Sequence, residues 1–89
     1  MPNTRSAEKR VRVIAKRTLR NRMIRSRMKT AIRRYQTALA EGNLEAAAEL
    51  YRKAASQIDR AAAKGVIHPN QASRRKARLA ARLNGLQAG

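Results

Sequence analysis

The residues of this sequence that indicate most clearly what it binds are its arginines and lysines. Arginine and lysine together number 22, against 5 aspartate and glutamate residues, which gives a net charge of +17. Sixteen of the cations are arginines, whose planar guanidinium groups form paired hydrogen bonds with phosphate oxygens. A positive charge of this size indicates a polyanionic partner and does not indicate the fold. The polyanions of a cell are nucleic acids and anionic membranes.

The charge is concentrated at the two ends of the chain. Residues 1–34 hold 13 basic and 1 acidic side chains, residues 35–67 hold 4 of each, and residues 68–89 hold 5 basic side chains and no acidic one. Like charges four residues apart on a helix each cost a few tenths of a kcal/mol, roughly, and phosphates would remove that repulsion while releasing counterions. We therefore expect both ends to contact a nucleic acid and the middle section to avoid it.

The sequence offers no catalytic or metal-binding set. His68 is the only histidine and there is no cysteine, so a zinc site and a disulfide framework are not expected, and a capping, packing or phosphate-contact role suits His68 better. The acidic residues of the middle section are explained by pairing with cations four residues away. With no nucleophile–base pair and no glycine-rich phosphate loop, we predict a protein that is not an enzyme and that binds no metal, cofactor or small-molecule substrate.

The element that presents most of these cations is a long helix predicted over residues 7–41, preceded by a basic arm over residues 1–6 with Ser6 or Thr4 as a possible helix N-cap. From Ile24 onward, apolar residues recur every three or four positions and form one stripe. This stripe contains Ile24, Met28, Ala31, Ile32, Tyr35, Ala38 and Leu39. Upstream, the apolar residues point in scattered directions among the cations. We therefore expect the C-terminal half to dock on a small core and the N-terminal half to project as a basic rod.

Two further helices follow. The first, over residues 43–64, has an unbroken apolar stripe from Leu44 to Ala62, and the preceding Gly42-Asn43 pair supplies a helix stop and a cap for a tight antiparallel turn. The second is predicted over residues 69–84, with Pro69 at its first position or Asn70 as its cap, and with a tail over residues 85–89. In this helix the residues expected to face inward are Ala72, Leu79, Leu83 and Leu86. Val66 and Ile67, which precede it, should cover the end of the core. The prediction is one all-α domain, an up-down-up three-helix bundle with an overlong, projecting basic first helix.

The composition also separates the possible polyanions. No apolar run approaches the roughly 18 residues of a membrane span, and the projecting half lacks the Trp and Phe residues of an interfacial helix, so no membrane partner is expected. Tyr35 and Tyr51 both lie in apolar stripes, which predicts core positions rather than surfaces for base stacking. A basic helix without stacking residues suits folded A-form RNA bound through its backbone. A small basic DNA-compacting nucleoid protein, and a helical adaptor that uses the outer face of residues 44–64, remain alternatives.

Three stretches of the chain resemble the bacterial-type ribosomal protein S20 family of the small subunit. Residues 3–10 (NTRSAEKR) are similar to the family's N-terminal pattern N-x-K-S-A-x-K-R. Residues 21–34 (NRMIRSRMKTAIRR) and residues 59–79 (DRAAAKGVIHPNQASRRKARL) resemble its long-helix pattern and its D-x-x-A-x-K-G-x-I-H-x-N pattern. The departures are Glu8, where a basic residue is common, and Pro69, where a lysine is usual. The resemblance covers nearly the whole chain.

The resemblance implies a structural constituent of the bacterial 30S subunit that binds 16S ribosomal RNA directly and early in assembly. It further implies a place between the RNA of the 5′ domain and the long penultimate helix of the 3′ end, few protein–protein contacts, and a cytoplasmic, ribosome-bound location in a bacterium or a plastid. The RNA-binding residues that it implies by matching positions are Asn3, Arg5, Ser6, Lys9, Arg10, Asn21, Arg25, Ser26, Lys29, Thr30, Arg33, Arg34, Lys64, His68, Asn70, Arg74 and Lys76. Charge and helical position add the following RNA-binding candidates: Arg12, Lys16, Arg17, Arg20, Arg22, Arg27, Arg75, Arg78 and Arg82.

Overall fold

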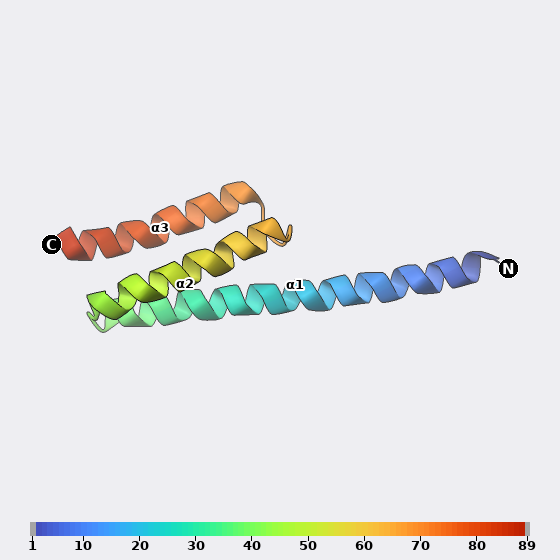
Figure 1. The fold of residues 1–89 in the computed structure, drawn as a ribbon, viewed down its shortest axis with the longest axis horizontal. Coiled ribbons are helices and arrows are strands. Elements are labelled where there is room, and N and C mark those ends of the chain that lie inside the picture. Colours follow the sequence, from blue (N-terminus) through green and yellow to red (C-terminus); the bar gives the residue numbers. More distant parts are fainter. Residues whose placement is uncertain (1, 89) are drawn as a thin grey trace.

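Three helices make up the described chain. The computed structural model describes the backbone of residues 2–88 and the side chains of residues 6–87. Helix α1 spans Pro2–Ala40, α2 spans Leu44–Ala63 and α3 spans Pro69–Ala88, and no strand occurs among the residues described. Helices α1 and α3 run in the same direction, and α2 runs oppositely and packs against both (Figure 1). With dimensions of 68 × 22 × 14 Å, the molecule is a long, thin three-helix bundle, and this confirms the predicted fold.

Two helix ends differ from the sequence prediction. Helix α1 begins at Pro2, so the non-helical arm over residues 1–6 and the N-cap at Ser6 or Thr4 were wrong for residues 2–6. Proline favours the first position of a helix because its fixed φ is already helical and its missing N–H is not needed there. Helix α3 continues to Ala88 through Gly85, whereas the prediction ended it at residue 84. Glycine permits the left-handed stop without imposing it, and Gly85 has no positive φ.

The turn between α1 and α2 forms as the Gly42-Asn43 pair predicted. Gly42 has a φ of 75°, its N–H donates to the carbonyl oxygen of Leu39 at 3.1 Å, and the Asn43 N–H donates to that of Ala38 at 3.1 Å. These two bonds satisfy carbonyls at the end of α1 that would otherwise lack partners. The Asn43 side chain then caps α2 by accepting from the N–H of Ala46 at 3.2 Å. One glycine and one asparagine thus reverse the chain.

A second turn of the same kind leads into α3. Gly65 has a φ of 74°, and the Val66 N–H donates to the Ala61 carbonyl oxygen at 2.9 Å. His68 is the cap of α3, because its Nδ1 atom accepts from the N–H of Asn70 at 3.1 Å and its carbonyl oxygen accepts from Gln71 and Ala72. Pro69 occupies the first helical position, as predicted, and Asn70 lies within the helix rather than capping it.

The core lies where α1 and α3 meet α2, and it follows the predicted stripes. Its buried residues are Ile24, Met28, Tyr35, Ala38, Ala47, Ala54, Ile58, Ala61, Val66, Ala72, Leu79 and Leu83. Three of the four buried α2 residues are alanines, and small side chains let neighbouring helices approach closely. Leu86 was expected inward but is 49% exposed, because α3 extends past the beginning of α2 (Figure 1).

Two tyrosines tie the helices together from inside this core. Tyr35 of α1 is completely buried and donates to the Leu79 carbonyl oxygen of α3, and Tyr51 of α2 donates to the Lys76 carbonyl oxygen at 3.4 Å. Their ring centroids lie 5.7 Å apart at an interplanar angle of 55°, a favourable tilted arrangement. The prediction of a core position is confirmed for Tyr35, whereas Tyr51 is partly buried and packs against the core.

Candidate nucleic-acid interface

The N-terminal half of α1 has no protein surface beside it. Every side chain from Ser6 to Arg20 is exposed, including Val11 at 66%, Ile14 at 61% and Leu19 at 61%. This half of α1 extends well beyond the other two helices (Figure 1). We call residues 6–20 the rod. The structure thus confirms that the N-terminal half of the first helix projects and that the apolar residues of the rod form no part of the core.

The rod carries cations on several sides, and one line of them continues into the bundle. Lys9, Arg12, Lys16 and Arg20 follow one another at spacings of three or four residues, so they lie on one side of the helix. Arg27 lies seven residues, two helical turns, beyond Arg20 and therefore on nearly the same side. The remaining predicted rod residues, Ser6, Arg10 and Arg17, are exposed as well. The side chains of Asn3 and Arg5 lie outside the described residues.

A second group of predicted residues gathers on the docked half of α1. A shallow hollow in its outer surface is lined by six residues, all of them predicted to bind RNA and none acidic. These are Arg22, Arg25, Ser26, Lys29, Thr30 and Arg33. Because they share one helix face opposite the core, a phosphate backbone lying there would meet four cations and two hydroxyl groups at once.

Three of the predicted residues also make bonds within the protein. Arg25 Nη2 lies 3.5 Å from the carbonyl oxygen of Val66, and Lys76 Nζ lies 2.8 Å from Asp59 Oδ1. The hydrogen bond to Asp59 raises the pKa of Lys76 above its ordinary value. His68 uses Nδ1 to cap α3, so in the neutral ring the proton is on Nε2, a group able to donate to a phosphate. These residues position the α2–α3 turn and the start of α3.

The α3 cations form a separate surface. Arg74, Arg75, Arg78 and Arg82 are all exposed. Their helix packs mainly against α2 and lies across it from α1 (Figure 1). The structure therefore does not place them in line with the rod. It presents two cationic surfaces, one along α1 and one on α3, rather than a single stripe.

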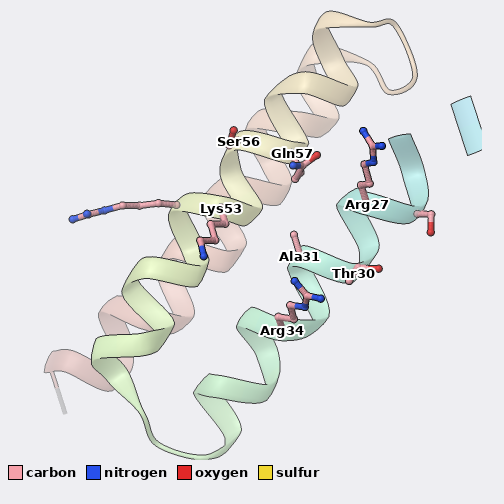
Figure 2. Close-up of a pocket in the computed structure, with 9 residues that line it drawn as sticks. Arg27, Thr30, Ala31, Arg34, Lys53, Ser56 and Gln57 are labelled. Atoms are coloured by element: carbon pink, nitrogen blue, oxygen red, sulfur yellow. The ribbon is translucent and has the colours of Figure 1, made fainter. Parts of the chain in front are cut away.

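Two cations of α2, Arg52 and Lys53, were missed by the sequence analysis. A groove between α1 and α2 is lined by Arg27 and Arg34 from α1 and by Lys53 from α2 (Figure 2). Arg52 of α2 also lines it. The α2 cations were set aside because the charges of residues 35–67 balance in sum. Their position in the sequence beside Tyr51 and Ala54 of the apolar stripe could have predicted this place, because residues at the edge of an apolar stripe border the neighbouring helix.

The described residues form neither a metal site nor a membrane-spanning helix. No group of three or more His, Asp or Glu side chains there lies close enough to hold a metal ion. None of the three helices, within that part of the chain, is both long enough and apolar enough to cross a membrane.

Comparison with known proteins agrees with the sequence resemblance. The family model described as ribosomal protein S20 matches residues 2–84. A small ribosomal subunit protein bS20 from Clostridium perfringens is 50% identical over 86 residues, which is 97% of this chain and 99% of that protein. The bS20 protein of a Roseiflexus species is 58% identical over 80 residues, covering 90% of this chain and 87% of the relative. That of Caldanaerobacter subterraneus subsp. tengcongensis is 50% identical over 97% of this chain and 82% of its own length.

Proposed function

The chain belongs to the ribosomal protein S20 family, and we propose that it holds RNA helices together in the small ribosomal subunit by binding folded 16S ribosomal RNA directly. Family membership makes it a ribosomal protein of the small subunit and not an enzyme, in agreement with the sequence analysis. The proposal concerns how the chain acts there: which surfaces meet the RNA, and through which chemical groups.

The observation that carries the proposal is the unsupported rod. Its side chains are exposed from Ser6 to Arg20, and Glu8 is its only acid against six cations. Repulsion between neighbouring cations opposes a helix that has no tertiary contacts to offset it. An external row of phosphates removes the repulsion and releases counterions, so RNA is the partner that stabilises this conformation.

Contact through the RNA backbone, rather than through bases, follows from the side chains that are present. Tyr35 and Tyr51 are occupied in the core, and the sequence contains no Phe or Trp. Base stacking on Tyr, Phe or Trp rings, a common route to single-stranded RNA, is therefore not available to the described surface. Arginines with exposed guanidinium groups instead suit the phosphates of A-form helices.

The two cationic surfaces support an architectural role. A protein with phosphate-binding residues on α1 and, across α2, on α3 has the means to hold two RNA segments at a fixed separation. We propose that these segments are the 5′-domain RNA and the long penultimate helix of the 3′ end. We also propose that binding occurs early in assembly, at a ribosome-bound location. The family resemblance is the source of these assignments, and the arrangement of cations is compatible with them.

A direct comparison of RNA with DNA tests the proposal. The protein is titrated against a transcript of the 16S 5′ domain and, separately, against duplex DNA with the same number of phosphates, at one salt concentration. We expect clearly tighter binding to the folded RNA. Equal affinity for the two would support the DNA-compacting alternative. Ribosome association that survives high salt would favour the protein adaptor, because phosphate contacts are weakened by salt.

A further inference from the structure

The groove between α1 and α2 is positively charged. Its lining includes four cations, Arg27, Arg34, Arg52 and Lys53, and no acidic residue. In Figure 2, Arg27 and Arg34 stand on the α1 side, and Lys53 approaches from α2. Ala31 projects between the helices and provides room in the groove because its side chain is a single methyl group (Figure 2).

Lys53, one of the two α2 cations of this groove, is available to a ligand. Within the described residues it forms an ion pair with Glu49, whose Oε1 atom lies 4.0 Å away, and the two side chains are 67% and 72% exposed. An exposed pair of this length contributes little to stability. The ammonium group of Lys53 therefore loses little by turning toward a phosphate.

The groove also lies on the path of the cation line that begins on the rod. Arg20, Arg27 and Arg34 are spaced by seven residues and occupy nearly the same side of α1. From Lys9 to Arg34 this line is about 38 Å long at 1.5 Å per residue. A phosphate backbone that follows the rod along this side is thereby led into the groove beside Lys53.

Neutral polar groups complete the lining. Ser26, Thr30 and Ser56 contribute hydroxyl groups that both donate and accept hydrogen bonds. Gln57 contributes an Oε1 atom that is buried and has no hydrogen-bond partner among the described residues. An unpaired buried acceptor is costly, and rotation of the Gln57 side chain toward the groove brings Oε1 within reach of a donor. A ribose 2′-hydroxyl can be that donor, and a phosphate oxygen cannot.

We propose that the groove between α1 and α2 is a binding site for one segment of RNA backbone, in which Arg27, Arg34 and Lys53 hold phosphates and Gln57 accepts from a ribose hydroxyl. This inference rests on the proposed function and extends it, because it brings α2 into the RNA interface. The balanced total charge of residues 35–67 conceals a local cationic surface. The interface then has three parts: the α1 face, the α3 face and this groove.

The test compares variants of the full-length chain for binding to deproteinised 16S ribosomal RNA over a range of KCl concentrations. Loss of one phosphate contact lowers the salt slope by about 0.9, which corresponds to roughly an eightfold loss of affinity at 0.1 M salt. We expect this result for Lys53→Gln and near-normal binding for Lys53→Arg, which keeps the charge. The matched control is Gln87→Glu, which lowers the net charge equally at an exposed α3 position outside the groove.

Two further variants separate a groove from a general charge effect. Ala31→Leu narrows the groove without changing any charge and should weaken RNA binding while thermal unfolding shows an intact fold. Gln57→Met should weaken binding to RNA more than binding to a DNA strand of the same sequence. If Lys53→Gln and Ala31→Leu bind no more weakly than Gln87→Glu, the groove is not an RNA site. In that case the proposed function still stands if the wild-type chain prefers ribosomal RNA to duplex DNA, and it fails separately if there is no such preference.

Discussion

The phenolic hydroxyl of Tyr35 in α1 donates a hydrogen bond to the carbonyl oxygen of Leu79 in α3. The two residues are 44 positions apart in the chain, and Tyr35 is completely shielded from solvent. Because α1 and α3 otherwise pack mainly against α2, this bond links the first and third helices directly. Together with the packing of both helices on α2, it holds the two cationic surfaces that we propose as RNA contacts in one arrangement.

Removing this hydroxyl should loosen the bundle without creating a large cavity. We expect Tyr35→Phe to lower the free energy of unfolding by about 1 kcal/mol, the net value of a typical buried hydrogen bond, as measured by urea denaturation. Tyr51→Phe is the matched control, because its bond to the Lys76 carbonyl oxygen is 3.4 Å long and only partly buried. A larger loss for Tyr51→Phe than for Tyr35→Phe would contradict this assignment.

The burial of Tyr35 also predicts a dependence of stability on alkaline pH. Burial raises the pKa of the Tyr35 hydroxyl above the ordinary value of 10.0, and the nearby Tyr51 acts in the same direction. The folded state therefore keeps its proton at a pH where the unfolded state has lost it. The resulting stability is fully present below pH 10 and declines as the pH rises through the folded-state pKa.

Absorbance titration of Tyr51→Phe isolates the remaining tyrosine and measures this shift. We expect its phenol to ionise above pH 10 and only as the helical circular dichroism signal falls. Ionisation at the ordinary pKa with the fold intact would show that Tyr35 is solvated. The titration should be repeated with Tyr35→Phe, in which the phenol that remains is not the completely buried one.

Two glycines should respond to alanine in opposite directions. Gly65 has a φ of 74° and open space around its Cα atom, so the added methyl group of Gly65→Ala meets no clash. The left-handed backbone is nevertheless unfavourable for alanine and should lower the free energy of unfolding by about 1 kcal/mol or more. Gly85 lies inside α3, also with open space around it, so Gly85→Ala should raise stability by up to about 1 kcal/mol. Thermal unfolding of both variants tests the corrected end of α3. Destabilisation by Gly85→Ala would restore the original prediction of a helix stop there.

Charge removal on the rod should affect RNA binding and leave the fold unharmed. The triple variant Arg12→Gln, Lys16→Gln, Arg20→Gln removes two like-charge pairs four residues apart, so its melting temperature should be unchanged or slightly higher. For about ten phosphates neutralised by the wild type, log affinity should fall with log salt at a slope near −9, and the variant should be shallower by about 2.7.

The control for the rod keeps all three charges: Arg12→Lys, Lys16→Arg, Arg20→Lys. It should retain the wild-type slope. A wild-type slope shallower than about −3 would be incompatible with contact to many phosphates. A melting temperature that drops sharply in the glutamine variant would show that these side chains support the fold.

The sequence predicted those parts of the fold in which local chemistry and tertiary packing agree. The stripe from Ile24 to Ala38, the reversal at Gly42 and Asn43, and Pro69 at the start of α3 each have a local physical signal that the structure confirms. The helix ends at Pro2 and Ala88 were misplaced because proline and glycine permit more than one backbone conformation. Neither residue determines its conformation without knowledge of its neighbours.

The candidate interface was predictable along α1, where cations exceed acids on every side. It was not predictable on α2, where Lys53 contributes to a groove together with Arg27 and Arg34. The net charge of a segment does not predict which of its cations face a neighbouring helix. The roles of His68 in capping α3 and of Lys76 in pairing with Asp59 likewise depend on distances that become known only in the folded molecule.

Hydrogen exchange of the rod amides, with and without 16S ribosomal RNA, tests the central claim most directly. The account predicts rapid exchange for residues 6–20 in the free protein, slow exchange for the amides of α2, and strong protection of residues 6–20 when RNA binds. Rod amides that exchange as slowly as those of α2 in the free protein, or that gain no protection on RNA binding, would contradict it.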